Sequence, residues 1–279
     1  MSNPSNPSIP SIPSTPSTPS TPSTPNTPNT PNTPSIRKPY GLVVLDMAGT
    51  TVADGGLVER AFERAAERLG VEPGSADHAD KLRYVRDTMG ESKISVFRHL
   101  FGTEDAARRA NTAFEEAYGE LVDGGLIAEV PGARKTVEEL RAAGRTVVLT
   151  TGFARVTQDA ILDALGWRDL VELTLCPADA GGRGRPYPDL VLAALLRTGA
   201  VDDVRQVAVA GDTAYDMLSG SRAGAGVVAG VLTGAHDRPA LLANGATEVL
   251  GSVAELPALL DALEAPDAPE ARDARERRA

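Results

Sequence analysis

The fold of this chain is decided by the stretch Leu42-Val43-Val44-Leu45-Asp46-Met47-Ala48-Gly49-Thr50-Thr51. With Gly41 before it, the stretch begins as a continuous apolar run in which polar side chains do not alternate with apolar ones. Such a run predicts a strand that is buried on both faces, as in a parallel sheet. The run ends at Asp46, so a carboxylate is expected where the strand stops.

Three further runs share this continuous apolar character. They lie at Thr146 to Leu149, Gln206 to Ala210 and Gly226 to Val231. Segments with helical periodicity precede them, among them Thr136 to Ala143 and Asp189 to Arg197. Because strand and helix alternate, the sequence predicts an α/β fold with a doubly wound, Rossmann-like parallel sheet.

The long segment between the first two runs contains no strand-like stretch. It is occupied by four amphipathic segments, at 57–69, 79–88, 92–100 and 104–122. A purely helical block in this place predicts an inserted cap domain at 55–127. The core domain is then expected to comprise residues 39–54 and 128–264.

Both ends of the chain differ from the rest. Prolines occupy every third position from Pro4 to Pro34, separated by Ser, Thr, Asn and Ile. Such a segment has almost no apolar surface to bury, so residues 1–38 are predicted to form a disordered arm. Residues 265–279 balance four acids with four arginines and are predicted to be a disordered, charged tail.

Composition excludes some classes of function. The net charge is −10, from 28 Lys and Arg against 38 Asp and Glu, which disfavours binding to a nucleic-acid backbone. The single cysteine, Cys176, can form no internal disulfide, and no apolar run is long enough to span a bilayer. The N-terminus also lacks the basic and apolar segments of a secretory signal. We therefore expect a cytoplasmic protein that binds neither nucleic acid nor membrane.

The polar residues at the strand ends predict the site. Ligands of an open parallel sheet bind at the carboxyl ends of its strands. The chain places Asp46, Thr150 or Thr151, and Asp212 with Asp216 at the ends of its apolar runs. Mg²⁺ prefers carboxylate oxygens and shares its ligand sphere with phosphoryl groups. These residues therefore predict a Mg²⁺ site with a phosphoryl group beside it.

Each of these residues also has a structural interpretation. An Asp or Thr after a strand is often only the N-cap of the next helix, and Arg185 could be a surface charge in the turn at 182–188. Arginine, however, holds phosphate through two donors, and Arg185 lies between the second and third strand ends. The order and spacing of the whole set favour a functional site.

Through these residues the sequence resembles the haloacid dehalogenase superfamily over nearly all of 40–264. The four motifs of the superfamily are matched in chain order by Asp46, by Thr150 or Thr151, by Arg185, and by Asp212 with Asp216. The resemblance implies that Asp46 is the nucleophile. It further implies a phosphoryl site formed by Thr150 or Thr151, Gly152 and Arg185, and a Mg²⁺ site formed by Asp46, the carbonyl of Ala48, Asp212 and Asp216.

Two departures narrow the resemblance to phosphonoacetaldehyde hydrolases, also called phosphonatases. Ordinary phosphatases of the superfamily have an acid two residues after the nucleophile, where this chain has Ala48. The stretch from Asp46 to Thr51, the arginine of the third motif and the segment from Met89 to Ile94 resemble phosphonatases instead. In that segment Lys93 matches the lysine that forms a Schiff base.

The chemistry of P–C cleavage explains why these departures occur together. Breaking a P–C bond leaves a carbanion, so an acid aimed at a leaving oxygen is of no use, whereas an iminium on the neighbouring carbon can accept the electrons. An arginine cannot form that iminium. The chain has only four lysines, at 38, 81, 93 and 135, and one of them stands at the matching position. A solvated helix lysine remains the alternative for Lys93.

The substrate pocket matches the phosphonatases incompletely. Val96, Gly56 and Phe153 stand where the family has a histidine, a cysteine and a tyrosine. These groups help proton transfer and aldehyde binding in the family, so the substrate stays open. His99 is predicted to be a surface or packing residue.

The leading hypothesis is a Mg²⁺-dependent phosphonatase-type hydrolase that acts on a small phosphonate or phosphate through an aspartyl-phosphate on Asp46. The first alternative is a phosphatase for small phosphate monoesters, similar to phosphoglycolate phosphatase. The second is a protein without enzymatic activity that presents its proline-rich arm to a partner. The resemblance also implies a homodimer formed through the caps.

Overall fold

The computed structural model describes residues 39–265. The predicted arm at 1–38 and the predicted tail beyond residue 265 lie outside the described residues. The strands are β1 (Leu42–Asp46), β2 (Val52–Ala53), β3 (Ala128–Glu129), β4 (Thr146–Thr150), β5 (Leu173–Leu175), β6 (Val207–Gly211), β7 (Val227–Val231) and β8 (Glu248–Leu250). The helices are α1 (Leu57–Arg68), α2 (Ala76–Asp87), α3 (Lys93–Phe101), α4 (Glu104–Asp123), α5 (Ala133–Ala142), α6 (Arg155–Leu165), α7 (Asp189–Thr198), α8 (Ala214–Ala223), α9 (Arg238–Ala243) and α10 (Leu256–Glu264). Short 3₁₀ helices lie at η1 (Pro177–Ala180), η2 (Val204–Gln206) and η3 (Val253–Glu255).

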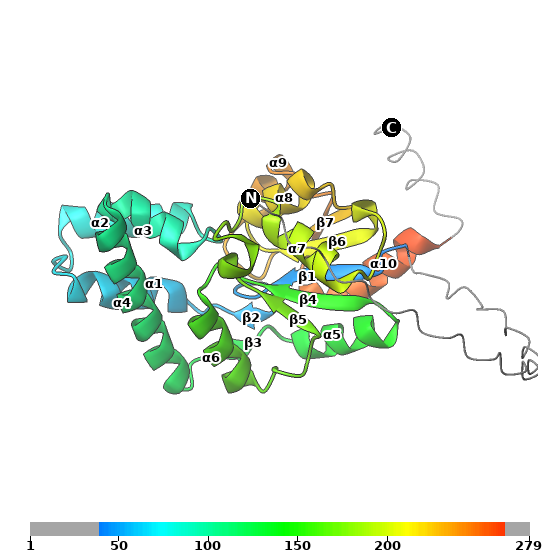
Figure 1. Ribbon diagram of the computed structural model, residues 1–279, viewed down its shortest axis with the longest axis horizontal. Coiled ribbons are helices and arrows are strands. Elements are labelled where there is room, and N and C mark those ends of the chain that lie inside the picture. The colour runs from blue at the N-terminus through cyan, green and yellow to red at the C-terminus, as the bar shows by residue number, and fades with distance from the viewer. Residues whose placement is uncertain (1–38, 266–279) are drawn as a thin grey trace, which may run out of the picture. The chain divides into compact units, whose positions relative to one another are not determined.

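The predicted parallel sheet is confirmed. Six strands pair in the order β5-β4-β1-β6-β7-β8, and every pair is parallel (Figure 1). The four predicted apolar runs form β1, β4, β6 and β7 at its centre. The chain order reverses at β1, which lies between β4 and β6, and this is where a doubly wound sheet opens a crevice for a ligand.

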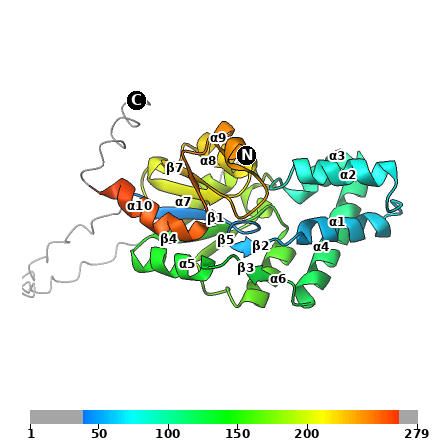
Figure 2. The ribbon, with the colours of Figure 1, turned by 180° about the vertical axis from the view of Figure 1, so that it is seen from behind.

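The two faces of the sheet are covered by different helices. Side chains of one strand point alternately to opposite faces. Val43 and Leu45 pack in one cluster with α5, α6 and α10, whereas Leu42 and Val44 pack in another with α7, α8 and α9. Figure 2 shows α5 and α10 lying along the sheet from behind. Burial of each large apolar side chain contributes about 1.5–3 kcal/mol to stability, so both layers hold the sheet.

The helical block between the first two central strands consists of α1 to α4. Its apolar cluster is continuous with the first face of the sheet and includes Phe62, Phe97 and Phe114. The expectation of no strand in this region is wrong, because β2 and β3 form an antiparallel pair of two residues each at the base of the block. The division into a cap at 55–127 and a core stays a prediction.

Some element boundaries differ from the predicted ones. Helix α2 begins at Ala76 rather than at residue 79, because the side chain of Ser75 accepts a hydrogen bond from the N–H of His78 and caps the helix. Helix α5 likewise begins at Ala133, before the predicted Thr136. The cores of both helices lie where the periodicity placed them.

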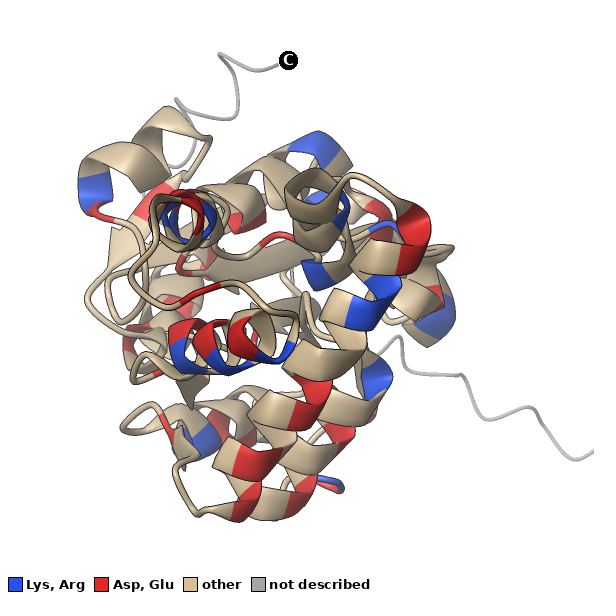
Figure 3. Cartoon of the chain, turned by 90° about the vertical axis from the view of Figure 1, so that its left-hand side faces the viewer, with Lys and Arg blue, Asp and Glu red and all other residues tan. Residues whose placement is uncertain are grey.

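Charged residues on the helical block are largely paired on its surface. Figure 3 shows basic and acidic residues interspersed on these helices. Arg68 lies 2.6 Å from Glu120, and Arg98 lies 2.8 Å from Glu104. Exposed pairs of this kind contribute at most about 1 kcal/mol each. None of the described helices is long and apolar enough to cross a membrane.

Candidate active site

The carboxyl edge of the sheet brings the predicted acids together. Asp46 is the last residue of β1 and pairs in register with Thr150 of β4, while Asp212 follows the end of β6 directly. Asp216 lies in the first turn of α8, where its carboxylate accepts the N–H of Thr213 at 3.1 Å. Oxygens of the three carboxylates lie within 4.8 Å of one another, and all three side chains are buried.

This cluster carries more negative charge than its protein partners compensate. Burial raises the pKa of Asp46 well above its ordinary value, and Arg185 opposes this effect. Burial, followed by the charge of Asp216, raises the pKa of Asp212 to about 7. Asp46 and Asp212, buried beside one guanidinium, therefore resist full ionisation. A divalent cation would compensate this charge, and its preference for carboxylate oxygens fits the donor set present.

Asp212 is held by contacts that leave no room for side chains on two neighbouring loops. Its Oδ2 accepts the N–H of Ala235 at 2.8 Å, and its Oδ1 accepts the hydroxyl of Thr50 at 3.3 Å. A Cβ at Gly49 would lie 2.4 Å from Oδ2 of Asp212, and one at Gly234 would lie 1.9 Å from it. Both glycines are needed for this approach, and at Gly49 the φ of +86° adds a second reason.

Arg185 lies beside the acid cluster and bonds two of its carboxylates. Its Nη1 donates to Oδ1 of Asp46 at 2.5 Å and also to Oδ1 of Asp216. The pKa of Arg185 is raised, because the two carboxylates outweigh the opposite effect of burial. Its Nε is buried and has no hydrogen-bond partner among residues 39–265. A buried donor without a partner is costly, so this N–H is available for an oxygen of a bound phosphoryl group.

The two threonines after β4 differ in their surroundings. The Oγ1 of Thr150 lies 3.4 Å from the carbonyl oxygen of Leu45 within the sheet. Thr151 lines the cavity beside Asp46, and its Oγ1 accepts the N–H of Phe153 at 3.2 Å. Of the two threonines, Thr151 is therefore the one that lines the cavity. Gly152 lines the same cavity.

The segment before α3 packs closely on the core loops. The N–H of Lys93 donates to the carbonyl oxygen of Gly152 at 3.2 Å. A Cβ at Gly90 would lie 2.4 Å from Oγ1 of Thr213, and one at Gly184 would lie 2.9 Å from Cβ of Ser92. The backbone around Lys93 thus lies against the loops that contain Gly152, Gly184 and Thr213. These contacts position the lysine at the site.

Lys93 differs from a solvated helix lysine. Its side chain is buried, and its Nζ lies 5.7 Å from the centre of the Phe153 ring. Its Nζ makes no hydrogen bond or ion pair within the part of the chain that the structure describes. Burial lowers the pKa of Lys93 to about 8, and Asp54 is the strongest charge acting against this shift. About a tenth of its amine is therefore unprotonated at pH 7, far more than for a lysine in water.

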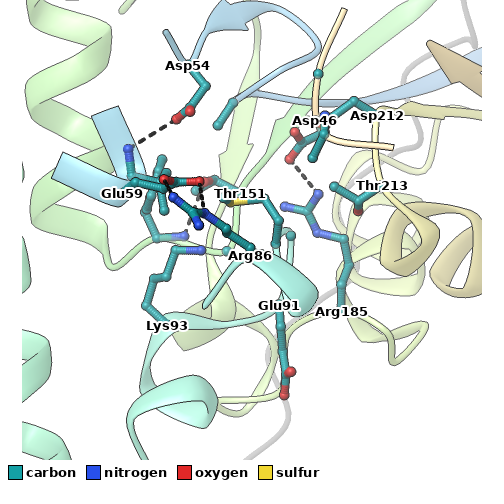
Figure 4. A pocket seen from close by; sticks show the side chains of 18 of the residues that line it. Asp46, Asp54, Glu59, Arg86, Glu91, Lys93, Thr151, Arg185, Asp212 and Thr213 are labelled. Carbon is teal, nitrogen blue, oxygen red and sulfur yellow. Dashed lines mark hydrogen bonds and ion pairs between the residues drawn. The ribbon is translucent and has the colours of Figure 1, made fainter. Parts of the chain in front are cut away.

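A cavity of about 440 Å³ connects the two halves of this site (Figure 4). The acids, Thr151 and Arg185 line one half, and Lys93 lines the other. Sequence reasoning missed Asp54, Glu59 and Arg86, which also line the cavity. Arg86 donates two hydrogen bonds to Glu59, at 2.9 and 2.7 Å. The one available signal was that Asp54 stands before the Gly-Gly pair that opens α1.

Comparison with known proteins agrees with this geometry. Residues 40–224 match the family model of haloacid dehalogenase-like hydrolases. The chain belongs to this family. It is therefore an enzyme of the hydrolase class, and the interpretation as a protein without enzymatic activity is set aside.

Relatives include both phosphonatases and phosphatases. The chain is 30% identical to a phosphonoacetaldehyde hydrolase of Bacteroides fragilis, over 79% of this chain and 95% of the relative. It is 28% identical to a protein named "Probable phosphatase IndB" of Dickeya dadantii, over 80% and 94% of the two chains. A crystal structure of a phosphonoacetaldehyde hydrolase-like protein from Oleispira antarctica has the same fold, with a TM-score of 0.68, 24% identity, and coverage of 81% and 92%.

The three positions at which this hydrolase departs from the phosphonatase pattern have different surroundings. Gly56 and Phe153 line the cavity, whereas Val96 is buried in the apolar cluster of the helical block. Phe153 packs against Tyr118, with ring centres 4.8 Å apart. His99 stacks on Tyr84, with ring centres 4.0 Å apart, and does not line the cavity with Lys93. His99 is thus an exposed residue that packs on Tyr84, in agreement with the prediction of a surface or packing residue.

Proposed function

We propose that this hydrolase cleaves the P–C bond of phosphonoacetaldehyde or a closely related aldehyde phosphonate. The observation that carries the proposal is that Asp46 and Lys93 line one cavity, one as a carboxylate beside Arg185 and the other as a buried amine without a hydrogen-bond partner among residues 39–265. A P–C hydrolase requires both groups at once, a nucleophile for phosphorus and an electron acceptor for carbon.

In the phosphoryl half of the cavity, Asp46 attacks phosphorus after the substrate aldehyde has become an iminium, which accepts the electrons of the breaking P–C bond. A new bond forms between its Oδ and phosphorus, and the P–C bond breaks. Arg185 and Thr151 hold phosphoryl oxygens, and the unpartnered Nε of Arg185 supplies a donor whose contact strengthens as charge develops. Water then hydrolyses the aspartyl-phosphate. We assign Mg²⁺ to Asp46, the carbonyl of Ala48, Asp212 and Asp216, where it would neutralise charge on the phosphoryl oxygens.

In the other half of the cavity, Lys93 forms the iminium that accepts the electrons of the P–C bond. Its amine condenses with the substrate aldehyde to give an iminium, and the electron pair of the P–C bond moves into the C–N unit as an enamine. Protonation of the enamine and hydrolysis release the aldehyde product and the free amine. Ala48, where ordinary phosphatases have an acid, agrees with a leaving group that has no oxygen to protonate.

The second candidate function is hydrolysis of small phosphate monoesters, as by a phosphoglycolate phosphatase. Two observations favour it. One relative is named as a probable phosphatase. In addition, Phe153 and Gly56 line the cavity where the phosphonatases have a tyrosine and a cysteine. In this case Asp46, Thr151 and Arg185 keep their roles, and Lys93 binds an anionic group of the substrate as an ammonium ion.

An assay of the phosphate that the full chain releases from its substrates decides between P–C hydrolysis and monoester hydrolysis. Phosphonoacetaldehyde is compared with a panel of small phosphate monoesters, phosphoglycolate included, at equal Mg²⁺ concentration. The proposal predicts that kcat/KM for phosphonoacetaldehyde exceeds that for every monoester and that Lys93→Arg loses the phosphonate activity selectively. Activity confined to monoesters, and equal in Lys93→Arg, would establish the phosphatase instead.

A further inference from the structure

We propose that Asp54 is the acid–base residue that serves the Lys93 amine. This inference rests on the proposed P–C hydrolase function and adds the group that moves the protons of its iminium step. Asp54 would take the proton from the Lys93 ammonium and return it to the hydroxyl that leaves as water.

Asp54 is held rigidly in the wall of the cavity. It follows β2 directly, and its carboxylate accepts the N–H of Gly56 at 3.1 Å and that of Val58 at 3.3 Å. Figure 4 shows Asp54 entering the site from the segment after β2, whereas Lys93 enters from the start of α3. Both line the same cavity, yet no ion pair joins them within residues 39–265. A substrate aldehyde bound in this cavity therefore has access to both groups.

The two groups influence each other electrostatically. Burial raises the pKa of Asp54, and its two backbone hydrogen bonds and then the charge of Lys93 oppose this. Asp54 is in turn the strongest charge that acts on Lys93. Glu59 on α1 also raises the pKa of Asp54, and burial followed by the charge of Asp54 raises the pKa of Tyr118 on α4. The pKa values of carboxyl group and amine thus shift towards each other, which eases proton transfer in both directions.

The other acids of the cavity are less suited to this task. Glu59 is fixed by two hydrogen bonds from Arg86, and these bonds lower its pKa. Figure 4 shows Glu91 directing its carboxylate away from both Lys93 and Asp54. Asp46 is bonded to Arg185 and is the nucleophile for phosphorus. Asp212 is held by Ala235 and Thr50 within the acid cluster. This leaves Asp54, the acid of the cavity whose charge acts most strongly on the amine.

The proton balance of the step requires one such group. The ammonium loses a proton to Asp54, and the amine nitrogen forms a bond to the aldehyde carbon. The second nitrogen proton moves to the former carbonyl oxygen, which gives a carbinolamine. Asp54 then returns its proton to the hydroxyl, the C–O bond breaks, and water and the iminium remain. Ammonium and aldehyde become iminium and water, and Asp54 ends as the carboxylate with which it began.

The test measures the rate at which borohydride traps the iminium on the full chain with phosphonoacetaldehyde. Asp54→Asn is expected to lower this rate by about 100-fold or more, within the range of general acid–base catalysis. Asp54→Ser, whose hydroxyl can still accept a backbone N–H, is expected to show the same loss. Asp123→Asn is the matched control, because Asp123 is exposed at the end of α4, outside the cavity.

A proton-transfer role is separated from a structural one by rescue. Formate, as an external carboxylate, is expected to restore trapping in Asp54→Ser but to leave Asp123→Asn unchanged, with melting temperatures measured for each variant. If the parent chain traps but the folded Asp54 variants trap at the parent rate, or formate restores nothing, the inference is wrong. If the parent chain neither traps nor releases phosphate from phosphonoacetaldehyde, the proposed function itself has failed.

Discussion

Arg185 donates through Nη1 to Oδ1 of Asp46 at a distance of 2.5 Å, and the same nitrogen donates to Asp216. The guanidinium therefore fixes the carboxylate that we propose as the nucleophile and another of the acids that we assign to the metal. Its Nε stays without a partner among the described residues. One arginine thus orients the nucleophile and offers a further donor to the phosphoryl group.

Replacement of Arg185 is expected to affect binding and turnover together. Arg185→Ala should raise KM and lower kcat, with kcat/KM reduced by about 100- to 1000-fold, because the same phosphoryl oxygens carry charge in ground and transition states. Arg185→Lys keeps the charge and should retain part of the activity. Arg183→Ala is the control, since Arg183 pairs with Asp189 on the surface of the same loop. Unchanged steady-state kinetics in Arg185→Ala would place this residue outside the site.

Close packing at Gly184 is expected to matter for activity more than for stability. In Gly184→Ala the new Cβ would lie 2.9 Å from Cβ of Ser92, so the segment that carries Lys93 must move away from the core loops. Turnover should fall at least tenfold, since a displaced catalytic group costs orders of magnitude in rate. In Gly119→Ala, on α4, nothing lies within 4 Å of the new Cβ, and full activity is expected. Equal kcat/KM values for both variants would show that the contact does not position Lys93.

The pH dependence of P–C cleavage should report the Lys93 amine. The amine attacks after it has lost its proton to Asp54 or to solvent, so the pH profile of kcat/KM is expected to bend near 8, the pKa that burial gives this residue. A lysine in water would place this bend near 10.4. A profile of kcat/KM between pH 6 and 10.5 on the full chain distinguishes the two, and an inflection near 10.4 would contradict a buried amine.

The buried lysine should also lower stability. Its pKa is lower in the folded chain than in the unfolded chain, so the unfolded chain binds more protons between about pH 8 and 10.4, and stability rises with pH in that window. Lys93→Met is expected to increase the free energy of unfolding at pH 7 by about 1–3 kcal/mol and to abolish this rise. Lys135→Met, at an exposed position, should change stability by less than about 0.5 kcal/mol. Denaturant titrations at pH 7 and 10 check both, and a destabilised Lys93→Met would refute the argument.

The sequence predicted the central strands well and the edges poorly. Continuous apolar runs mark β1, β4, β6 and β7 because both faces of these strands are buried. Strands β5 and β8 were not anticipated, since each has three residues, is only partly buried and lies at an edge of the sheet. Pairing of β2 with β3 depends on two residues from each strand, which is too short for any periodicity.

The site shows the same division between local and tertiary information. Asp46, Asp212 and Arg185 could be predicted because each follows a strand or stands in a recognisable motif. The role proposed for Asp54 could not be predicted, because it depends on Lys93, which the fold brings to the same cavity from another helix. The choice of Thr151 over Thr150 likewise required the side-chain directions at the end of β4, which spacing alone does not determine.

The most direct test of an iminium on Lys93 is to identify the residue that borohydride modifies. The full chain is incubated with Mg²⁺ and phosphonoacetaldehyde, reduced with borohydride, digested and examined by mass spectrometry, with Lys93→Arg treated in parallel. P–C cleavage through an iminium on Lys93 predicts a stable adduct on the peptide that contains Lys93. It predicts no adduct on the other lysines within residues 39–265, and none at position 93 in the variant. Release of phosphate from phosphonoacetaldehyde without any adduct on Lys93 would contradict it.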